Sequence, residues 1–139
     1  MSLRQSPPMS EAEARLLNPL KMAYLGDSVW ELMVGGRLIA LGYNVRHMHK
    51  AAVASVNARA QAEALQRIGS LLTEAEAEIV RRGRNAHPHH AAPRHQELAD
   101  YQAATALEAL MGYLYLTGQE DSLKQLFSAS QTEDESCPK

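Results

Sequence analysis

Apolar residues recur at helical intervals along most of the chain, and strand-like alternation bounded by Asn-Gly or Asp-Gly turns is missing. This pattern predicts an all-α fold, a helical bundle without a sheet. The ends of the apolar runs and the turn residues predict six helices, over 10–17, 18–42, 46–68, 74–84, 97–116 and 121–127. The segment 85–95 has no periodicity and contains prolines, so we expect an exposed loop there.

Capping residues support two of these helix starts. Asn18 and Pro19 are typical of an N-cap and a first helical turn, and Thr73 followed by Glu76 predicts a capping box. Gly35 and Gly36 weaken the long helix by about 1 kcal/mol each relative to alanine. Such a pair indicates a close contact with another helix at that point.

Length and composition restrict the class of protein. The chain has 139 residues, enough for one domain, and we expect a polar leader with a short helix over 1–17, a folded domain over 18–127 and a disordered tail over 128–139. Cys137 is the only cysteine, which excludes a disulfide framework and indicates a reducing compartment. No segment has the composition of a secretory signal or a membrane span, so the cytoplasm is expected.

Two acidic positions stand out against apolar surroundings. Asp27 and Glu31 lie four residues apart on one helix face, and Glu108 lies within the apolar run ATALEALMGYLYL. If the two long helices pack together, Asp27 and Glu108 converge and could bind one hard cation such as Mg²⁺. That arrangement permits metal-assisted hydrolysis. The alternative is that each acid is an ordinary solvated or ion-paired residue.

A basic stretch lies within a chain whose net charge is −2. No acid occurs between Ile79 and Gln96, whereas Arg81, Arg82, Arg84 and Arg94 do, together with His87, His89, His90 and His95. Arginine forks bind phosphate oxygens, and Gly83 with Asn85 would let the backbone turn toward a polyanion. The alternative is that cations are simply favoured at a helix C-terminus. Lys50 and Arg59, with His49, form a weaker second basic set.

Several motifs resemble a known family. The segment AYLGDSVWEL, 23–32, resembles the signature of ribonuclease III catalytic domains, and TALEALMGYLYL, 105–116, resembles their second acidic motif. The resemblance is narrowed to Mini-ribonuclease III by two further segments, RRGRNA at 81–86 and MHKAAVASVNARAQAEAL at 48–65. It covers about 18–126.

The resemblance implies an all-α, homodimeric endoribonuclease that uses Mg²⁺ to hydrolyse both strands of an RNA duplex. In bacteria the family is associated with maturation of the large-subunit ribosomal RNA precursor. Asp27 and Glu108 match the catalytic, metal-holding carboxylates. Mini-ribonucleases III lack a separate RNA-binding domain, so the basic residues are expected to contact RNA: Arg81, Arg82, Arg84, Asn85, Lys50 and Arg59.

The sequence departs from the broader family at a few positions. Ala23 and Thr105 stand where the broader family has two further carboxylates, which implies a reduced, looser metal site. Gln102 replaces an arginine that is frequent in relatives, and Asn57 a usual serine. Because of these departures, one alternative is a catalytically silent ribonuclease III fold that binds structured RNA without cleaving it. A helical module that docks an acidic protein partner is a further alternative.

Overall fold

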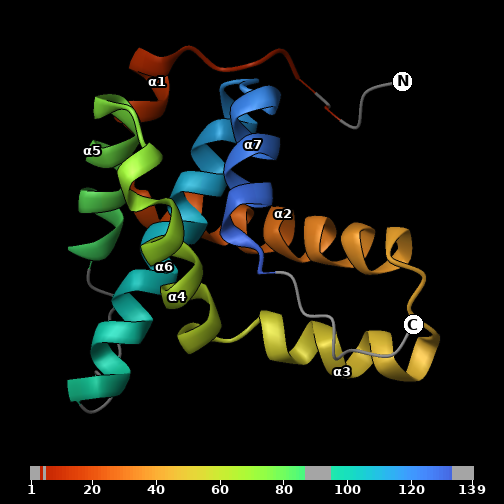
Figure 1. Cartoon of the computed structure of the whole chain (residues 1–139). Helices are drawn as coiled ribbons and strands as arrows, with labels where there is room; N and C mark the ends of the chain where they lie inside the picture. The colour runs from red at the N-terminus through yellow and green to blue at the C-terminus, as the bar shows by residue number, and fades with distance from the viewer. Residues whose placement is uncertain (1–3, 5, 87–94, 133–139) are drawn as a thin grey trace.

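The structure is a computed structural model that describes residues 4, 6–86 and 95–132, and Figure 1 shows its course. Within these ranges it contains helices and no strand, so the predicted all-α class is confirmed. The helices are α1 (Glu11–Arg15), α2 (Pro19–Ala40), α3 (Val45–Ser55), α4 (Ala58–Ile68), α5 (Glu74–Arg84), α6 (His95–Leu116) and α7 (Glu120–Ser130), with the 3-10 turn η1 (Gly69–Leu71).

The predicted caps are present. The Asn18 side chain accepts a hydrogen bond from the Leu20 amide at 2.9 Å, and Pro19 occupies the first turn of α2. At α5 the Thr73 hydroxyl accepts from the Glu76 amide, while the Glu76 carboxylate accepts from the Thr73 amide. Both helices therefore begin where their side chains satisfy the otherwise unpaired amides of a helix start.

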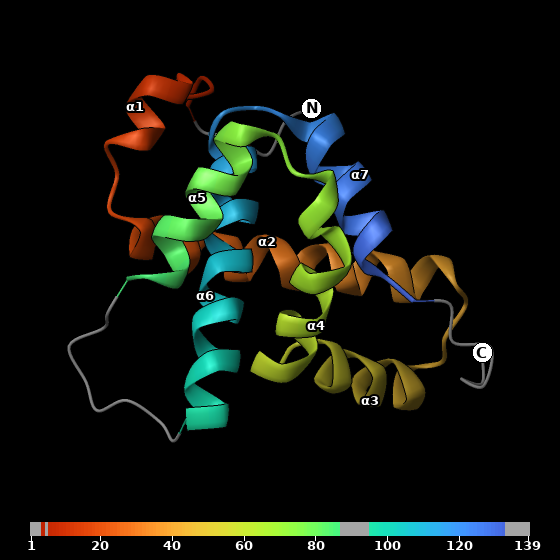
Figure 2. The ribbon, with the colours of Figure 1, turned by 60° about the vertical axis from the view of Figure 1, so that its left-hand side comes forward.

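Helix α6 is the centre of the bundle. It crosses α2, is flanked by α4 and α5, and carries α7 on a further side, while α3 packs against α2 (Figures 1 and 2). Its side chains are buried along most of its length because neighbours surround it. The fully enclosed ones include Leu107, Leu110, Met111, Tyr113 and Leu114. Two long helices that are apolar on nearly every side thus form the core.

Glycines allow α2 and α6 to touch through their backbones. A β-carbon on Gly26 would lie 1.6 Å from the carbonyl oxygen of Glu108, and one on Gly112 would lie 2.0 Å from that of Met22. Only glycine permits such an approach. The close contact expected at Gly35 and Gly36 is wrong within this chain, since no heavy atom of another element lies within 4 Å of a β-carbon at either position.

The single helix predicted over 46–68 is wrong, because the chain forms two helices there. Asn57 separates them: its side-chain oxygen accepts from the Ala60 amide at 2.9 Å, and its Nδ2 donates to the carbonyl oxygens of Val53 and Ala54. Asparagine competes with the helical backbone in this way, ending α3 and starting α4. The surrounding alanines hid this boundary.

Trp30 joins three helices near the α2–α6 crossing. Its indole Nε1 donates to the carbonyl oxygen of Ser55, the last residue of α3, at 3.2 Å. Its ring meets the Phe127 ring of α7 edge to face, with centroids 5.2 Å apart. A buried tryptophan with its N–H paired is a strong anchor.

The C-terminal helix is longer than expected. It extends to Ser130 rather than Phe127, so the disorder predicted for 128–130 is wrong, and 133–139, the rest of the predicted tail, lie outside the described residues. The Ser130 carbonyl oxygen accepts from Arg67 of α4 at 2.6 Å, and that of Thr132 from Arg37 of α2 at 3.2 Å. These bonds hold the end of α7 against the bundle.

The loop between α5 and α6 is shorter than the predicted 85–95, because α6 already begins at His95. Residues 87–94, with most of the predicted basic and histidine-rich loop, lie outside the described part of the chain. Within the parts that are described, no helix is long and apolar enough to cross a membrane.

Candidate active site

The α2–α6 crossing brings Asp27 and Glu108 together. Asp27 directly follows Gly26, the residue whose backbone lies against the Glu108 carbonyl group. The two carboxyl groups interact through a hydrogen bond in which protonated Glu108 donates to Asp27. The expected convergence of the two acids is therefore present, while their catalytic and metal-holding roles stay predictions.

The surroundings of Glu108 favour its protonated form. Burial, the hydrogen bond to Asp27 and the negative charges of Asp27 and Glu31 raise its pKa from 4.5 to about 8, although the Gln61 side chain acts in the opposite direction. At neutral pH and without a cation, Glu108 is therefore mostly protonated. A site that resists carrying two negative charges gains most from a bound cation.

Few side chains at the crossing could bind a metal, and their ligand atoms are oxygens. Across 6–86 and 95–132, no cluster of three or more His, Cys, Asp or Glu side chains gathers to hold a metal. Ala23 and Thr105, the positions where the broader family has carboxylates, are both buried, and the Thr105 hydroxyl donates to the Tyr101 carbonyl oxygen at 3.0 Å. Asp27 and Glu108 are thus the carboxylates at the crossing, with Glu31 exposed beside them.

The sequence reasoning missed Gln61. This residue of α4 is buried at 4 % exposure, and its side chain lies close enough to Glu108 to lower the pKa of that carboxyl group. A signal was present in the sequence, because Gln61 begins a buried stripe whose other members are apolar: Ala64, Leu65 and Ile68. A polar side chain that is buried in such a stripe needs a hydrogen-bond partner.

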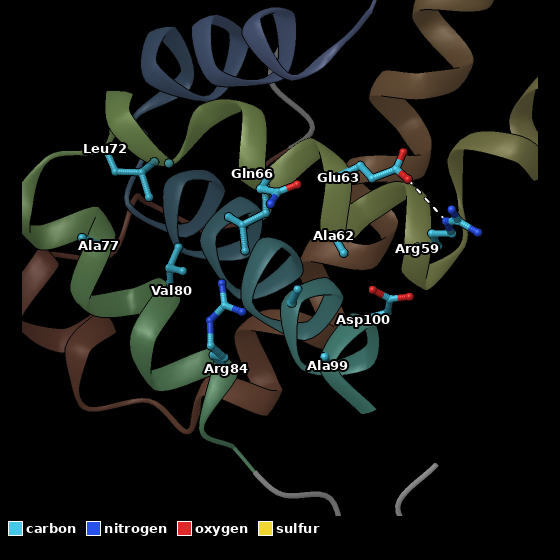
Figure 3. Close-up of a pocket in the computed structure, with 13 residues that line it drawn as sticks. Arg59, Ala62, Glu63, Gln66, Leu72, Ala77, Val80, Arg84, Ala99 and Asp100 are labelled. Carbon is cyan, nitrogen blue, oxygen red and sulfur yellow. Dashed lines mark hydrogen bonds and ion pairs between the residues drawn. The ribbon is translucent and has the colours of Figure 1, made fainter. Parts of the chain in front are cut away.

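Two of the predicted RNA-binding arginines share a pocket. Arg84 of α5 and Arg59 of α4 line a cavity of about 870 Å³ between α4, α5 and α6, with Asp100 of α6 also at its wall. Figure 3 shows Arg84 directed into this pocket, whereas Arg59 is paired with Glu63 at 3.4 Å. Lys50 lies exposed on α3 and Asn85 is exposed at the end of α5.

The other two predicted arginines have partners within the chain. Arg82 donates to the carbonyl oxygens of Arg15 and Leu17 at 2.8 and 2.9 Å, which ties the segment after α1 to α5. Arg81 forms an exposed ion pair with Glu78, to which its Nε donates at 2.9 Å. Arg82 thus has a structural contact that the sequence did not indicate.

The interpretation of Gly83 as a turn residue is wrong. Helix α5 continues through Arg84, and Gly83 is buried inside it, where a β-carbon would lie 2.9 Å from the Ala106 Cα atom of α6. Its missing side chain therefore serves close helix packing. The helix ends at Arg84, and Asn85, which follows as its C-cap, has ordinary right-handed backbone angles.

The comparisons with known proteins decide the family. The sequence profile of the ribonuclease III domain matches residues 20–119 of the chain. The chain belongs to the ribonuclease III family. Curated relatives called Mini-ribonuclease 3 include one from Symbiobacterium thermophilum, 45% identical over 123 residues, which are 88% of this chain and 94% of that protein. Another, from a Thermoanaerobacter species, is 43% identical over 115 residues, covering 82% and 80%.

A crystal structure of a Fusobacterium nucleatum protein has the same fold. It is 33% identical, superposes with a TM-score of 0.73, and the match covers 82% of this chain and 93% of that one. The resemblance to Mini-ribonuclease III that the motifs indicated is confirmed. The ribonuclease III family consists of endoribonucleases that act on double-stranded RNA, and this chain is similar to its members over most of its length.

Proposed function

We propose that this ribonuclease III-type chain cleaves both strands of RNA duplexes with Mg²⁺ held by Asp27 and Glu108. The observation that carries the proposal is the pairing of these carboxyl groups, one from α2 and one from α6, at the backbone contact of Gly26. A fixed helix crossing holds two acids against their mutual repulsion. An arrangement that only packed the core would be better served by apolar side chains.

The chemistry of the two acids fits magnesium. Carboxylate oxygens without histidine or cysteine are the donors that this hard cation prefers, and a few suffice because Mg²⁺ keeps waters and substrate phosphates as further ligands. The bound cation supplies an activated water and neutralises charge on the phosphate. Asp27 and Glu108 would hold the cation at one place on the protein, where both side chains are half-buried.

The RNA is expected to lie across the basic residues near the α5–α6 connection. The residues that could contact phosphates at separate points of a duplex come from α3, α4 and the end of α5: Lys50, Arg59, Arg84 and Asn85. Arg81 and Arg82 would first have to leave their partners. Recognition of A-form RNA depends mainly on its shape and backbone. We place the large-subunit ribosomal RNA precursor first among substrates, and hence the enzyme in the cytoplasm.

A homodimer is supported by one face of α2. Tyr24, Leu32 and Ile39 lie seven or eight residues apart on this helix, so they share a face, and all three are exposed. Gly35 lies on the same face and would allow a second copy to approach closely. A two-fold axis there relates two catalytic pairs, as cleavage of two antiparallel strands requires.

The test is cleavage of a labelled RNA duplex by the purified protein with Mg²⁺ and with excess chelator. Asp27→Asn and Glu108→Gln are expected to abolish cleavage while duplex binding and the circular dichroism spectrum stay unchanged. Asp121→Asn on α7, an exposed acid, is the matched control and should cleave normally. Cleavage retained in Asp27→Asn would contradict the proposal, and binding without any Mg²⁺-dependent cleavage would favour the silent RNA-binding alternative.

The substrate assignment has a separate test. A transcript of the large-subunit ribosomal RNA precursor and an unrelated duplex of equal length are offered together to the enzyme. Preferred cleavage at defined positions in the stem of the precursor is the expected result. Equal rates and scattered cuts on both substrates would remove the ribosomal assignment while leaving the nuclease activity in place.

A further inference from the structure

Gln61 is a polar side chain in an apolar position. It is 4 % exposed, and the residues that follow it on the buried side of α4 are Ala64, Leu65 and Ile68. Its Nε2 atom is buried and makes no hydrogen bond of standard geometry. A buried amide without a partner destabilises a fold, so packing alone gives no reason for glutamine at this place.

The amide lies beside the Glu108 carboxyl group. The Gln61 side chain lies near enough to this carboxyl group to favour its charged form. Helix α4 packs against α6, so the approach of Gln61 to Glu108 is fixed by the core and not by a mobile surface chain. Glu108 is thus contacted by Asp27 from α2 and by Gln61 from α4.

The position of Gln61 complements the reduced acid set. Ala23 and Thr105 supply no charged group beside Asp27 and Glu108, because one is apolar and the other donates its hydroxyl hydrogen to Tyr101. A carboxylate with fewer neighbours has more freedom to rotate about its last bond. Groups that orient metal-binding carboxylates by hydrogen bonds affect metal affinity although they do not touch the ion.

We infer that Gln61 is a positioning residue whose Nε2 donates to one carboxylate oxygen of Glu108 and so turns the other oxygen toward Asp27 and the bound cation. The inference rests on the proposed metal site. In this arrangement the otherwise unpaired amide has a partner once Glu108 binds the cation as a carboxylate. The amide and the cation therefore favour the same state of the carboxylate.

The test uses Gln61→Met, which keeps the shape of the side chain and removes the amide. Gln125→Met, the same change at an exposed position of α7, is the matched control. Binding of Mn²⁺ alone is measured by calorimetry, and cleavage is measured as kcat and KM for a duplex. We expect Mn²⁺ affinity to fall about tenfold or more in Gln61→Met. The kcat should fall, while KM stays at the wild-type value and the metal-free Tm does not fall, because the substitution removes an unpaired buried amide.

The outcomes separate the two proposals. If the wild type does not bind Mn²⁺, the metal site and the role of Gln61 are both wrong. If the wild type binds Mn²⁺ and Gln61→Met binds it equally well, only the inference about Gln61 is overturned. Should Gln61→Met fail to fold, the wild type is used instead: the side-chain amide resonances of Gln61 must shift when Mg²⁺ is added. Resonances that Mg²⁺ leaves unchanged overturn the inference.

Discussion

The α-carbon of Gly26 faces the backbone carbonyl group of Glu108 so closely that a β-carbon would lie 1.6 Å from its oxygen. This contact lies one residue before Asp27, so it fixes how closely the backbone segments that carry the two acids approach each other. The geometry of the candidate site is consequently a property of helix packing, and it should fail when that packing is changed.

Gly26→Ala is expected to lower the free energy of unfolding by about 3 kcal/mol or more, because the helices must separate to admit the methyl group. Any folded fraction should cleave RNA poorly, since Asp27 and Glu108 move apart. The measurement is urea unfolding followed by cleavage assays.

Gly69→Ala is the matched control for that substitution. Gly69 has a φ of −53° and no neighbouring atom within 4 Å of a β-carbon, so alanine should raise stability by about 0.4–1 kcal/mol. Equal effects of the two alanines would show that the contact between α2 and α6 is looser than described.

The raised pKa of Glu108 predicts how metal-free stability depends on pH. The folded value is about 8 and the ordinary one 4.5, so the folded protein binds the extra proton between them. The stabilisation is present below pH 4.5 and is lost as the pH rises to about 8. The Tm in chelator should therefore fall over this range.

Glu108→Gln should remove that part of the pH dependence, because the amide does not titrate. With Mg²⁺ in excess the wild type should lose it as well, since the cation replaces the proton, and metal affinity should increase with pH. A Tm profile that Glu108→Gln leaves unchanged would mean that other groups dominate.

The arginines are expected to divide into two classes. Arg84→Ala, at the pocket of Figure 3, should weaken duplex binding and reduce the slope of log K against log salt concentration by about one, with no change in Tm. Arg82→Ala should instead lower stability by about 1–3 kcal/mol, because the carbonyl groups of Arg15 and Leu17 lose their donor. Filter binding over a salt series and thermal unfolding distinguish them, and the reverse pattern would contradict this division.

The exposed face of α2 makes a prediction about assembly. Leu32→Asp should give a monomer, because a buried carboxylate without a partner is strongly disfavoured in an apolar interface. Leu71→Asp in η1 changes an equally apolar, exposed residue away from this face and should leave the dimer intact. Sedimentation equilibrium measures both. A wild type that is monomeric at high concentration would rule out the interface.

Local sequence signals were sufficient to predict the ends of helices where a residue type has a single physical role. The caps at Asn18 and Thr73 and the end of α6 at Leu116 could be predicted directly from the sequence. The pairing of Asp27 with Glu108 required two motifs far apart in the sequence and knowledge of the family that combines them. The helix class and the acid pair were therefore predictable.

The remaining features depend on neighbours that a sequence does not display. The roles of Gly26 and Gly83 follow from what lies opposite each glycine, and the sequence pattern directed attention instead to Gly35 and Gly36. From the sequence Arg82 is predicted to contact nucleic acid, whereas in the structure it donates to the carbonyl groups of Arg15 and Leu17. Tertiary partners decide such residues, because their side chains suit several environments equally well.

Trp30 gives the protein an intrinsic optical label. It is the only tryptophan in the chain, and its indole lies where α2, the end of α3 and α7 meet, three residues after Asp27. Fluorescence excited at long wavelength therefore originates at this junction alone. Emission recorded during mixing with RNA or a divalent cation would follow movements at this junction in real time, without any attached dye or engineered residue.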